Sequence, residues 1–243
     1  MVGAIDIHCH VLPGVDDGAK NIDESLEMLS IMHDEGIRTV ILTPHYHGGR
    51  MEPDAGKIRD RYDKLCAEAA QNEKLKDMGL YLGCEIYYYP SVTDWLDEGR
   101  VFSMADSSYV LLEFGFTMEK RMIAEGVSTI VNSGYVPIIA HIERYEHLVG
   151  DLAQVDGLIE KGALVQINSE CLYARHRVSS FAKKLLKEKM VHFLATDAHD
   201  TYDRAPALSD AAYYIAKHYG KDYCKSLIFD NPVKVLKNEY ISR

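Results

Sequence analysis

The feature that most constrains this chain is a series of short, continuously apolar runs, separated by longer segments with helical periodicity. Runs without alternating polar residues are typical of parallel strands that are covered on both faces. Strands are expected at Ala4–His8, Thr39–Thr43, Leu80–Glu85, Tyr109–Glu113, Val136–His141, Leu164–Asn168 and His192–Thr196. This order predicts an α/β fold, either a parallel barrel or a doubly wound open sheet, and periodicity alone does not separate the two.

The chain is expected to form one domain over residues 1–243, because it contains no Ser/Pro/Gly-rich linker, low-complexity tract or short internal repeat. The clearest helix signal lies between the first two strands. Asn21 can cap a helix with Glu24 three residues later, and Gly36 follows the end of the apolar pattern.

Charge and cysteine usage limit the classes of protein to which the chain can belong. A formal net charge of −10 argues against nucleic acid or an acidic membrane surface as the main partner. No apolar run is long enough to span a bilayer, and the first residues lack the pattern of a signal peptide, so membrane insertion is not expected. The five cysteines are scattered without a CxxC pair, which favours reduced thiols in the cytoplasm over disulfides or structural zinc.

Potential metal ligands stand at the ends of most of the expected strands. His8 and His10 are two residues apart, so both side chains can point to the same side of an extended chain. Asp16 and Asp17 follow on the next loop. The later strand ends bring His45, Glu85, Glu113, His141, Asp197 and His199, with His47 close behind His45.

In a parallel barrel all these ends lie on one face, which is where active sites of such barrels are assembled. A single pair of histidines two residues apart is a weak signal, and a strand-terminal carboxylate is more often a helix cap. The joint pattern is much more specific, and it predicts a site for several divalent cations. Oxygen and imidazole ligands suit Mn²⁺, Fe or Zn²⁺ rather than a thiolate centre.

Seven short motifs occur in a fixed order along the chain. They are DIHCH at 6–10, VDDG at 15–18, TPH at 43–45, GCEIYY at 83–88, LLEF at 111–114, HIERY at 141–145 and TDAH at 196–199, followed by Arg204. In this order they resemble the polymerase and histidinol phosphatase (PHP) superfamily. Within it, the chain is similar to the bacterial manganese-dependent protein-tyrosine phosphatases of capsule and exopolysaccharide operons, and the resemblance covers nearly the whole chain.

The resemblance implies a distorted (β/α)₇ TIM-like barrel with three divalent metals at the C-terminal face of the strands, most often Mn²⁺, with Fe or Zn²⁺ as alternatives. It implies metal ligands at His8, His10, Asp17, His45, Glu85, Glu113, His141, Asp197 and His199, with Glu85 as a bridging ligand. Arg144 and Arg204 would bind the phosphate and stabilise the transition state. A metal-bridging hydroxide would attack phosphotyrosine on the tail of a bacterial tyrosine autokinase that controls polysaccharide assembly.

Other functions fit parts of the sequence. A small-molecule phosphomonoesterase such as histidinol phosphatase uses the same kind of site, whereas the acidic balance counts against an exonuclease module. Retention of the full ligand set argues against a binding module with a degenerate site. Cys171 and Arg177 have the spacing of a cysteine-dependent tyrosine phosphatase, but the residues between them lack the glycine that a phosphate cradle needs.

The sequence leaves open the role of one histidine, the role of three consecutive tyrosines and the oligomeric state. His47 could be a ligand, a proton donor or a loop residue. Tyr87, Tyr88 and Tyr89 could line a substrate mouth or pack against neighbouring residues. The sequence does not indicate an oligomeric state.

Overall fold

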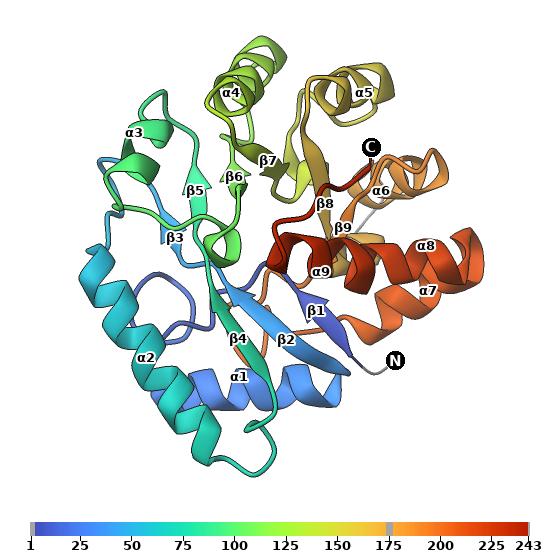
Figure 1. Ribbon diagram of the computed structural model, residues 1–243. Coiled ribbons are helices and arrows are strands. Elements are labelled where there is room, and N and C mark those ends of the chain that lie inside the picture. The colour runs from blue at the N-terminus through green and yellow to red at the C-terminus, as the bar shows by residue number, and fades with distance from the viewer. Residues whose placement is uncertain (1–2, 174–176, 243) are drawn as a thin grey trace.

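Parallel strands surrounded by helices make up the computed structural model, which describes residues 3–173 and 177–242 (Figure 1). The strands are β1 (Ala4–Asp6), β2 (Ile37–Leu42), β3 (His45–Tyr46), β4 (Gly79–Leu82), β5 (Glu85–Tyr87), β6 (Tyr109–Glu113), β7 (Val136–Ile139), β8 (Leu164–Asn168) and β9 (Phe193–Ala195). They pair in the orders β1-β2-β4 and β3-β5-β6-β7-β8-β9. Every one of these pairings is parallel, as the continuous apolar runs predict.

Two neighbouring strand positions are interrupted at the same level of the sheet. Pro44 has no N–H to donate to a ladder, and it separates β2 from β3. The facing strand breaks at residues 83–84, between β4 and β5. Leu42 pairs with Leu82 before the break and His45 pairs with Glu85 after it, so the register is unchanged. The prediction that Glu85 ends a strand is therefore wrong, because Glu85 begins β5.

The first and last strands meet at their C-terminal ends, which decides between barrel and open sheet. Cys9 forms a parallel bridge with Ala198. The His10 N–H donates to the Ala198 carbonyl at 2.8 Å, and the Asp197 N–H donates to the His8 carbonyl at 2.8 Å. The chain thus forms a distorted barrel of seven strand positions, two of them interrupted, as the (β/α)₇ prediction requires.

A packed apolar core fills the interior of the barrel at the N-terminal ends of the strands. Ile5 and Ile7 contribute from the first strand and its extension, and Phe193 contributes from β9. Val235 and Ile241, near the C-terminus, pack into the same cluster and close the end of the barrel opposite the predicted site. A second, larger core lies between the strands and the surrounding helices.

The helices form an outer layer around the strands, and α9 lies beside β1 (Figure 1). They are α1 (Ile22–Asp34), α2 (Ala55–Gln71), α3 (Val92–Asp97), α4 (Lys120–Asn132), α5 (Leu152–Glu160), α6 (Arg177–Lys187), α7 (Ser209–Tyr219), α8 (Lys221–Lys225) and α9 (Asn231–Leu236). Short helical turns lie at η1 (Met104–Asp106), η2 (Ile142–Arg144), η3 (Ser169–Leu172) and η4 (Ser226–Asp230). Among the described residues, no helix combines the length and the apolar character needed to cross a membrane.

Helix α1 begins where the capping signal predicts. The Asn21 side chain accepts a hydrogen bond from the Glu24 N–H at 3.0 Å. The Glu24 carboxylate accepts from the Lys20 N–H at 2.8 Å, one residue earlier than in a standard capping box. Gly36 follows the helix with a φ of +87°, a conformation that favours glycine.

Glu35 joins the end of α1 to the start of α7. Its carboxylate accepts hydrogen bonds from the Leu208 and Ser209 N–H groups at 2.9 and 2.8 Å. Partial burial alone would raise the pKa of Glu35, but these donors favour the carboxylate and hold the pKa below its ordinary 4.5. The glutamate therefore supplies the negative charge that the N-terminus of α7 favours.

Glu35→Gln is expected to lower the free energy of unfolding by about 1 kcal/mol at pH 7, a value reduced for the partial exposure of the side chain. Because the folded pKa is depressed, the stabilisation is fully present above 4.5 and is lost as pH falls through the lower folded pKa. Urea unfolding from pH 3 to 8 should therefore show the two proteins converging in acid. Glu27→Gln, on an exposed position of α1, is the control. A difference that is constant with pH would contradict this account.

Candidate active site at the C-terminal face of the barrel

Four buried side chains converge beyond the ends of β1 and β9. The Nε2 atoms of His8 and His10 lie 3.3 Å apart. Both lie 3.2–3.4 Å from Glu85 Oε2 and Asp197 Oδ1. Five of the six distances among these atoms are 3.2–3.4 Å, and the sixth, between the two oxygens, is at most 4.8 Å, so one cation could lie about 2.0–2.4 Å from all four, close to the usual distances from Zn²⁺ to its ligands. The donor atoms are thus spaced as the ligands of a single cation.

Outer hydrogen bonds turn the imidazole lone pairs toward this centre. His8 Nδ1 lies 3.1 Å from Gln166 Oε1, and His10 Nδ1 lies 2.7 Å from Asp16 Oδ2. The Gln166 oxygen also accepts from the His141 N–H, so it is an acceptor and His8 Nδ1 is the donor. With both protons on Nδ1, the Nε2 atoms are free to bind a metal, as in other histidine metal sites.

Glu85 extends the cluster to a second group of donors. Its Oε2 lies 2.9 Å from His45 Nδ1, and its Oε1 lies 2.8 Å from His141 Nε2. Glu113 lies further out, 3.9 Å from His45 Nδ1 and 3.8 Å from His141 Nε2. Because Glu85 contacts both groups, it occupies the position expected of a bridging carboxylate.

A third group lies on the solvent side of the first. Asp17 Oδ1 is 3.6 Å from both His45 Nε2 and His199 Nε2, and these atoms lie within 4.8 Å of a ring nitrogen of His10. His199 Nδ1 lies 2.9 Å from the Asp197 carbonyl oxygen, to which it donates, so its Nε2 carries the lone pair. The structure therefore brings together every predicted ligand, and the ligand role of each stays a prediction.

The balance of charge in the cluster fits the binding of cations. Burial, together with the neighbouring Glu85 carboxylate, raises the pKa of Glu113 to about 7. Burial would also raise the pKa of Glu85, but His8 and His45 hold it well below its ordinary range. Glu85 Oε2 and His199 Nε2 are buried and have no hydrogen-bond partner within the described chain. Such atoms are costly to bury unless a ligand pairs them, and divalent cations suit this donor set.

The two predicted arginines meet at one carboxylate oxygen beside the cluster. Arg144 Nη1 and Arg204 Nη2 each lie 3.0 Å from Asp197 Oδ2. The other oxygen of Asp197 faces His8 and His10. Arg144 also donates to Glu170 at 2.9 Å. Both guanidinium groups therefore lie directly next to the candidate metal site, where their planar forks suit a phosphate group.

Two of the predicted site residues have left-handed backbone conformations. His141 has a φ of +30° and Asp197 a φ of +54°, directly or shortly after β7 and β9. Such conformations are uncommon for residues other than glycine and often occur at functional sites. The expected strand Val136–His141 included His141, and the expected strand His192–Thr196 ended directly before Asp197. The structure ends β7 at Ile139 and β9 at Ala195, because the chain must turn to point these side chains into the site.

Three supporting residues were missed or left without a role by the sequence analysis. Asp16 positions His10 and also accepts from the His45 N–H at 2.9 Å. Gln166 donates to Asn168 at 2.7 Å, and Asn168 donates to Asp197 Oδ2 at 2.8 Å. The sequence does indicate Gln166 and Asn168, since two amide side chains two residues apart on a strand that ends at the site point to the same side.

Gln166→Leu keeps the size of the side chain but removes the acceptor of His8 Nδ1–H. We expect metal affinity to fall by about 10- to 100-fold, which is typical when the outer partner of a ligating histidine is lost. Metal titration monitored by activity, together with metal content per chain, would measure this. Gln71→Leu changes the same residue type at an exposed position and should leave affinity unchanged. Equal affinities for the Gln166→Leu variant and the wild type would contradict the tautomer assignment.

Cys171 does not have the environment of a catalytic nucleophile. It is 3% exposed, and burial raises the pKa of its thiol well above the ordinary value, so it stays protonated. Arg177 donates to the Val149 carbonyl at 3.4 Å. Part of the intervening segment, residues 174–176, lies outside the described residues. The thiol chemistry that the spacing allows is therefore not supported.

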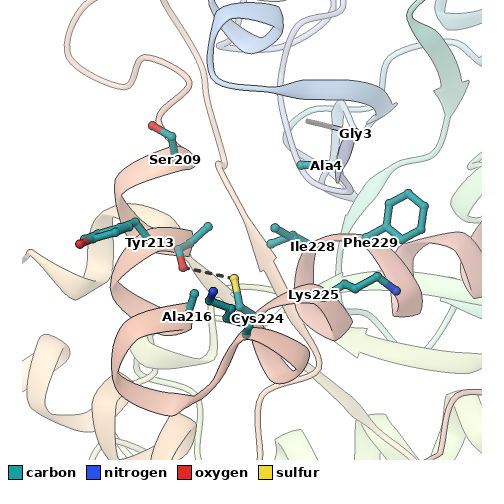
Figure 2. Close-up of a pocket in the computed structure, with 11 residues that line it drawn as sticks. Gly3, Ala4, Ser209, Tyr213, Ala216, Cys224, Lys225, Ile228 and Phe229 are labelled. Carbon is teal, nitrogen blue, oxygen red and sulfur yellow. Dashed lines mark hydrogen bonds between the residues drawn. The ribbon is translucent and has the colours of Figure 1, made fainter. Parts of the chain in front are cut away.

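A larger cavity lies away from this site. It has a volume of about 520 Å³ and is lined by residues of β1, α7, α8 and η4, several of which are drawn in Figure 2. Its walls include Ala4 and Ile228, and Cys224 donates its thiol to the Ala212 carbonyl at 3.2 Å. The lining contains no histidine or carboxylate, and it lies at the start of β1, whereas the candidate metal ligands lie beyond the end of this strand. Cavity size therefore does not locate the chemistry here.

A family model described as capsular polysaccharide synthesis, CpsB/CapC, matches residues 4–237 of this chain. The chain belongs to the CpsB/CapC family. This membership confirms the resemblance to the bacterial capsule phosphatases, and it agrees with the order of motifs along the whole sequence.

Curated and solved members of the CpsB/CapC family cover the chain almost completely. The tyrosine-protein phosphatase CpsB of Streptococcus pneumoniae is 34% identical over 98% of this chain and 100% of its own length. The tyrosine-protein phosphatase YwqE of Bacillus subtilis is 33% identical over 98% and 94%. A crystal structure from work on these two proteins, called unique metal-dependent tyrosine phosphatases, superposes with a TM-score of 0.90 at 32% identity, covering 98% of this chain and 96% of that one.

Proposed function

We propose that this chain is a metal-dependent protein-tyrosine phosphatase. The observation that carries the proposal is the convergence of buried histidines and carboxylates beside two arginines that hold one of those carboxylates. Full-length similarity to the tyrosine-protein phosphatases CpsB and YwqE supports the same reaction. This similarity favours the function over histidinol phosphate hydrolysis and over an exonuclease, and retention of every motif argues against a degenerate binding module.

We further propose that three divalent ions, with Mn²⁺ the expected metal, would be held by these overlapping donor groups, each histidine giving its one lone pair to a single ion and Glu85 serving more than one. Bound ions would supply Lewis acidity and lower the pKa of an attacking water. His8, His10 and His199 present the lone pair on Nε2, because their Nδ1 protons are directed to Gln166, Asp16 and a main-chain carbonyl. The carboxylates balance the added positive charge.

Arg144 and Arg204 would bind the equatorial phosphate oxygens, where negative charge must be stabilised in the transition state. Asp197 orients both guanidinium groups before substrate arrives. A phenolate is a good leaving group, so phosphotyrosine hydrolysis needs no strong general acid. The buried Cys171 thiol takes no part, and no phosphoenzyme is required.

The physiological substrate is proposed to be a phosphotyrosine segment of a bacterial tyrosine kinase that acts in capsule or exopolysaccharide synthesis. The capsule-synthesis description of the family supports this. Residues 1–243 are proposed to act as one PHP-type domain, in agreement with a family match that spans residues 4–237. The cytoplasmic location expected from the cysteine pattern remains a prediction.

Chelation and metal add-back test the proposal most directly. The purified protein would be assayed with a phosphotyrosine peptide and with histidinol phosphate, before chelation, after chelation, and after addition of Mn²⁺, Fe²⁺ or Zn²⁺. We expect turnover of the peptide to be lost with the metal, to return with at least one ion, and to exceed that of histidinol phosphate. Full activity after complete metal removal would overturn the metal mechanism. A preference for histidinol phosphate would overturn the substrate class.

A further inference from the structure

A small pocket opens directly beside the candidate metal site. It has a volume of about 220 Å³, and it is lined by Asp17, His45, His47, Arg50, Met51 and Glu113. Asp17, His45 and Glu113 are predicted metal ligands, so one side of the pocket is where the phosphate would react. A cavity of about 150 Å³ holds a benzene molecule. This pocket therefore has room for one aromatic ring next to the chemistry.

The other side of the pocket is a tight hairpin that contains His47 and Met51. The His47 N–H donates to the Met51 carbonyl at 2.7 Å, and the Met51 N–H donates back at 2.8 Å. Gly49 turns the chain with a φ of +74°. Gly48 packs so closely on Trp95 that a Cβ would lie 2.5 Å from the indole ring. The hairpin is thus fixed by its own hydrogen bonds and by contact with α3.

The imidazole of His47 is held by aromatic packing rather than by hydrogen bonds. Its ring centroid lies 4.1 Å from that of Tyr87 and 5.8 Å from that of Tyr89. Its Nδ1 is buried and has no hydrogen-bond partner in the described chain. His47 is absent from the donor groups that could share a cation among the described residues. A flat ring on a rigid aromatic support is suited to contact another ring.

We propose that His47 and Met51 form the walls of a subsite for the phenyl ring of phosphotyrosine, with Tyr87 supporting His47 from behind. The inference rests on the proposed function and goes beyond it, because it names residues that select aromatic over alkyl phosphate esters. A preformed wall lowers the cost of ordering the site when substrate binds. The thioether of Met51 also makes favourable contacts with aromatic rings.

The test compares the metal-loaded wild type with His47→Ala and Met51→Ala. Calorimetry would give the Kd for phenylphosphonate and methylphosphonate, and assays would give kcat/KM for phosphotyrosine and phosphoserine versions of one peptide. In each variant, we expect the preference for the aromatic member of each pair to fall about tenfold. The fall should come mainly from a higher Kd and KM for the aromatic compound. Metal content and thermal unfolding would show that each variant is folded and loaded.

Two matched controls lie far from the pocket in the chain. His218→Ala removes an exposed histidine that stacks on Tyr214 at 4.4 Å, much as His47 stacks on Tyr87. Met122→Ala removes a methionine that is 50% exposed on α4. Both controls should keep the wild-type preference. Unchanged preference in folded, metal-loaded His47→Ala and Met51→Ala would overturn the subsite. So would wild-type protein that binds phenylphosphonate no more tightly than methylphosphonate.

Failure of the subsite and failure of the proposed function give different results. If the wild type hydrolyses no phosphotyrosine peptide under any metal condition, the proposed function is wrong. The phosphonate pair then still decides whether an aromatic ring binds between His47 and Met51. If the wild type hydrolyses the phosphotyrosine peptide and both wall variants retain the full aromatic preference, only the subsite is wrong.

Discussion

Glu85→Gln is expected to lower kcat by more than about a thousandfold, equivalent to roughly 4 kcal/mol of barrier. The reason is the shared position of this carboxylate. Its Oε2 lies within 3.3 Å of His8, His10 and His45, and its Oε1 lies 2.8 Å from His141. A neutral amide offers one oxygen in place of two charged ones and turns an N–H₂ group toward the other histidines. The donor group around His8 and His10 and the donor group around His45 should therefore both lose a ligand.

The measurement pairs kcat with metal content per chain, determined by mass spectrometry of the desalted protein. The Glu85→Gln variant should lose more than one equivalent of metal, and excess metal should not restore wild-type kcat. Glu98→Gln, an exposed glutamate at the end of α3, makes the same chemical change as a control. Near-normal activity with full metal occupancy in Glu85→Gln would show that the carboxylate does not bridge metals.

The strand order could be read from the sequence, but the closure of the barrel could not. Continuous apolar runs identify parallel strands that are covered on both faces, and they say nothing about which strand lies beside the first. Closure depends on contacts between residues about 190 positions apart. Asp6 accepts from the Thr196 N–H at 3.1 Å and from its hydroxyl, and burial raises the pKa of Asp6 to about 6. A buried aspartate in an apolar run gives no sign of its partner.

The breaks in the sheet were only partly visible in the sequence. Pro44 signals the end of β2, because proline cannot donate to the ladder. The break between β4 and β5 has no such residue. It follows from the pairing with the segment around Pro44, since Glu85 N–H donates to the Pro44 carbonyl at 3.1 Å. A local sequence pattern does not show an interruption that a neighbouring strand imposes.

The convergence of the candidate site residues could be predicted because parallel topology gathers distant residues. Once the strands are parallel, their C-terminal ends must share a face, so His8, Glu113 and His141 converge without any information about loops. The roles of Asp16 and Asp17 could not be told apart in this way. Asp16 is buried and holds His10, whereas the Asp17 side chain is 58% exposed and faces His45 and His199. Adjacent carboxylates on a loop acquire different roles only through the path of the backbone.

Substitution of the two arginines is expected to lower activity while leaving the metals in place. Arg144→Ala and Arg204→Ala should each reduce kcat/KM on the order of a hundredfold to a thousandfold, as is typical when a group that stabilises developing negative charge is removed. Metal content should stay near that of the wild type. Asp197 Oδ2 keeps the second guanidinium and the Asn168 amide in either variant, so its other oxygen remains directed at His8 and His10.

The double variant separates binding of phosphate from support of Asp197. If both guanidinium groups act on the same phosphate, the loss in Arg144→Ala/Arg204→Ala should be smaller than the product of the single losses. Lysine at either position should recover only part of the activity, because an ammonium group cannot form the bidentate contact. Kinetics with a phosphotyrosine peptide at saturating Mn²⁺ would compare the wild type with all five variants. If excess metal instead restored either single alanine variant to wild-type activity, the arginines would act by holding Asp197 in place, and their assignment to the phosphate would be wrong.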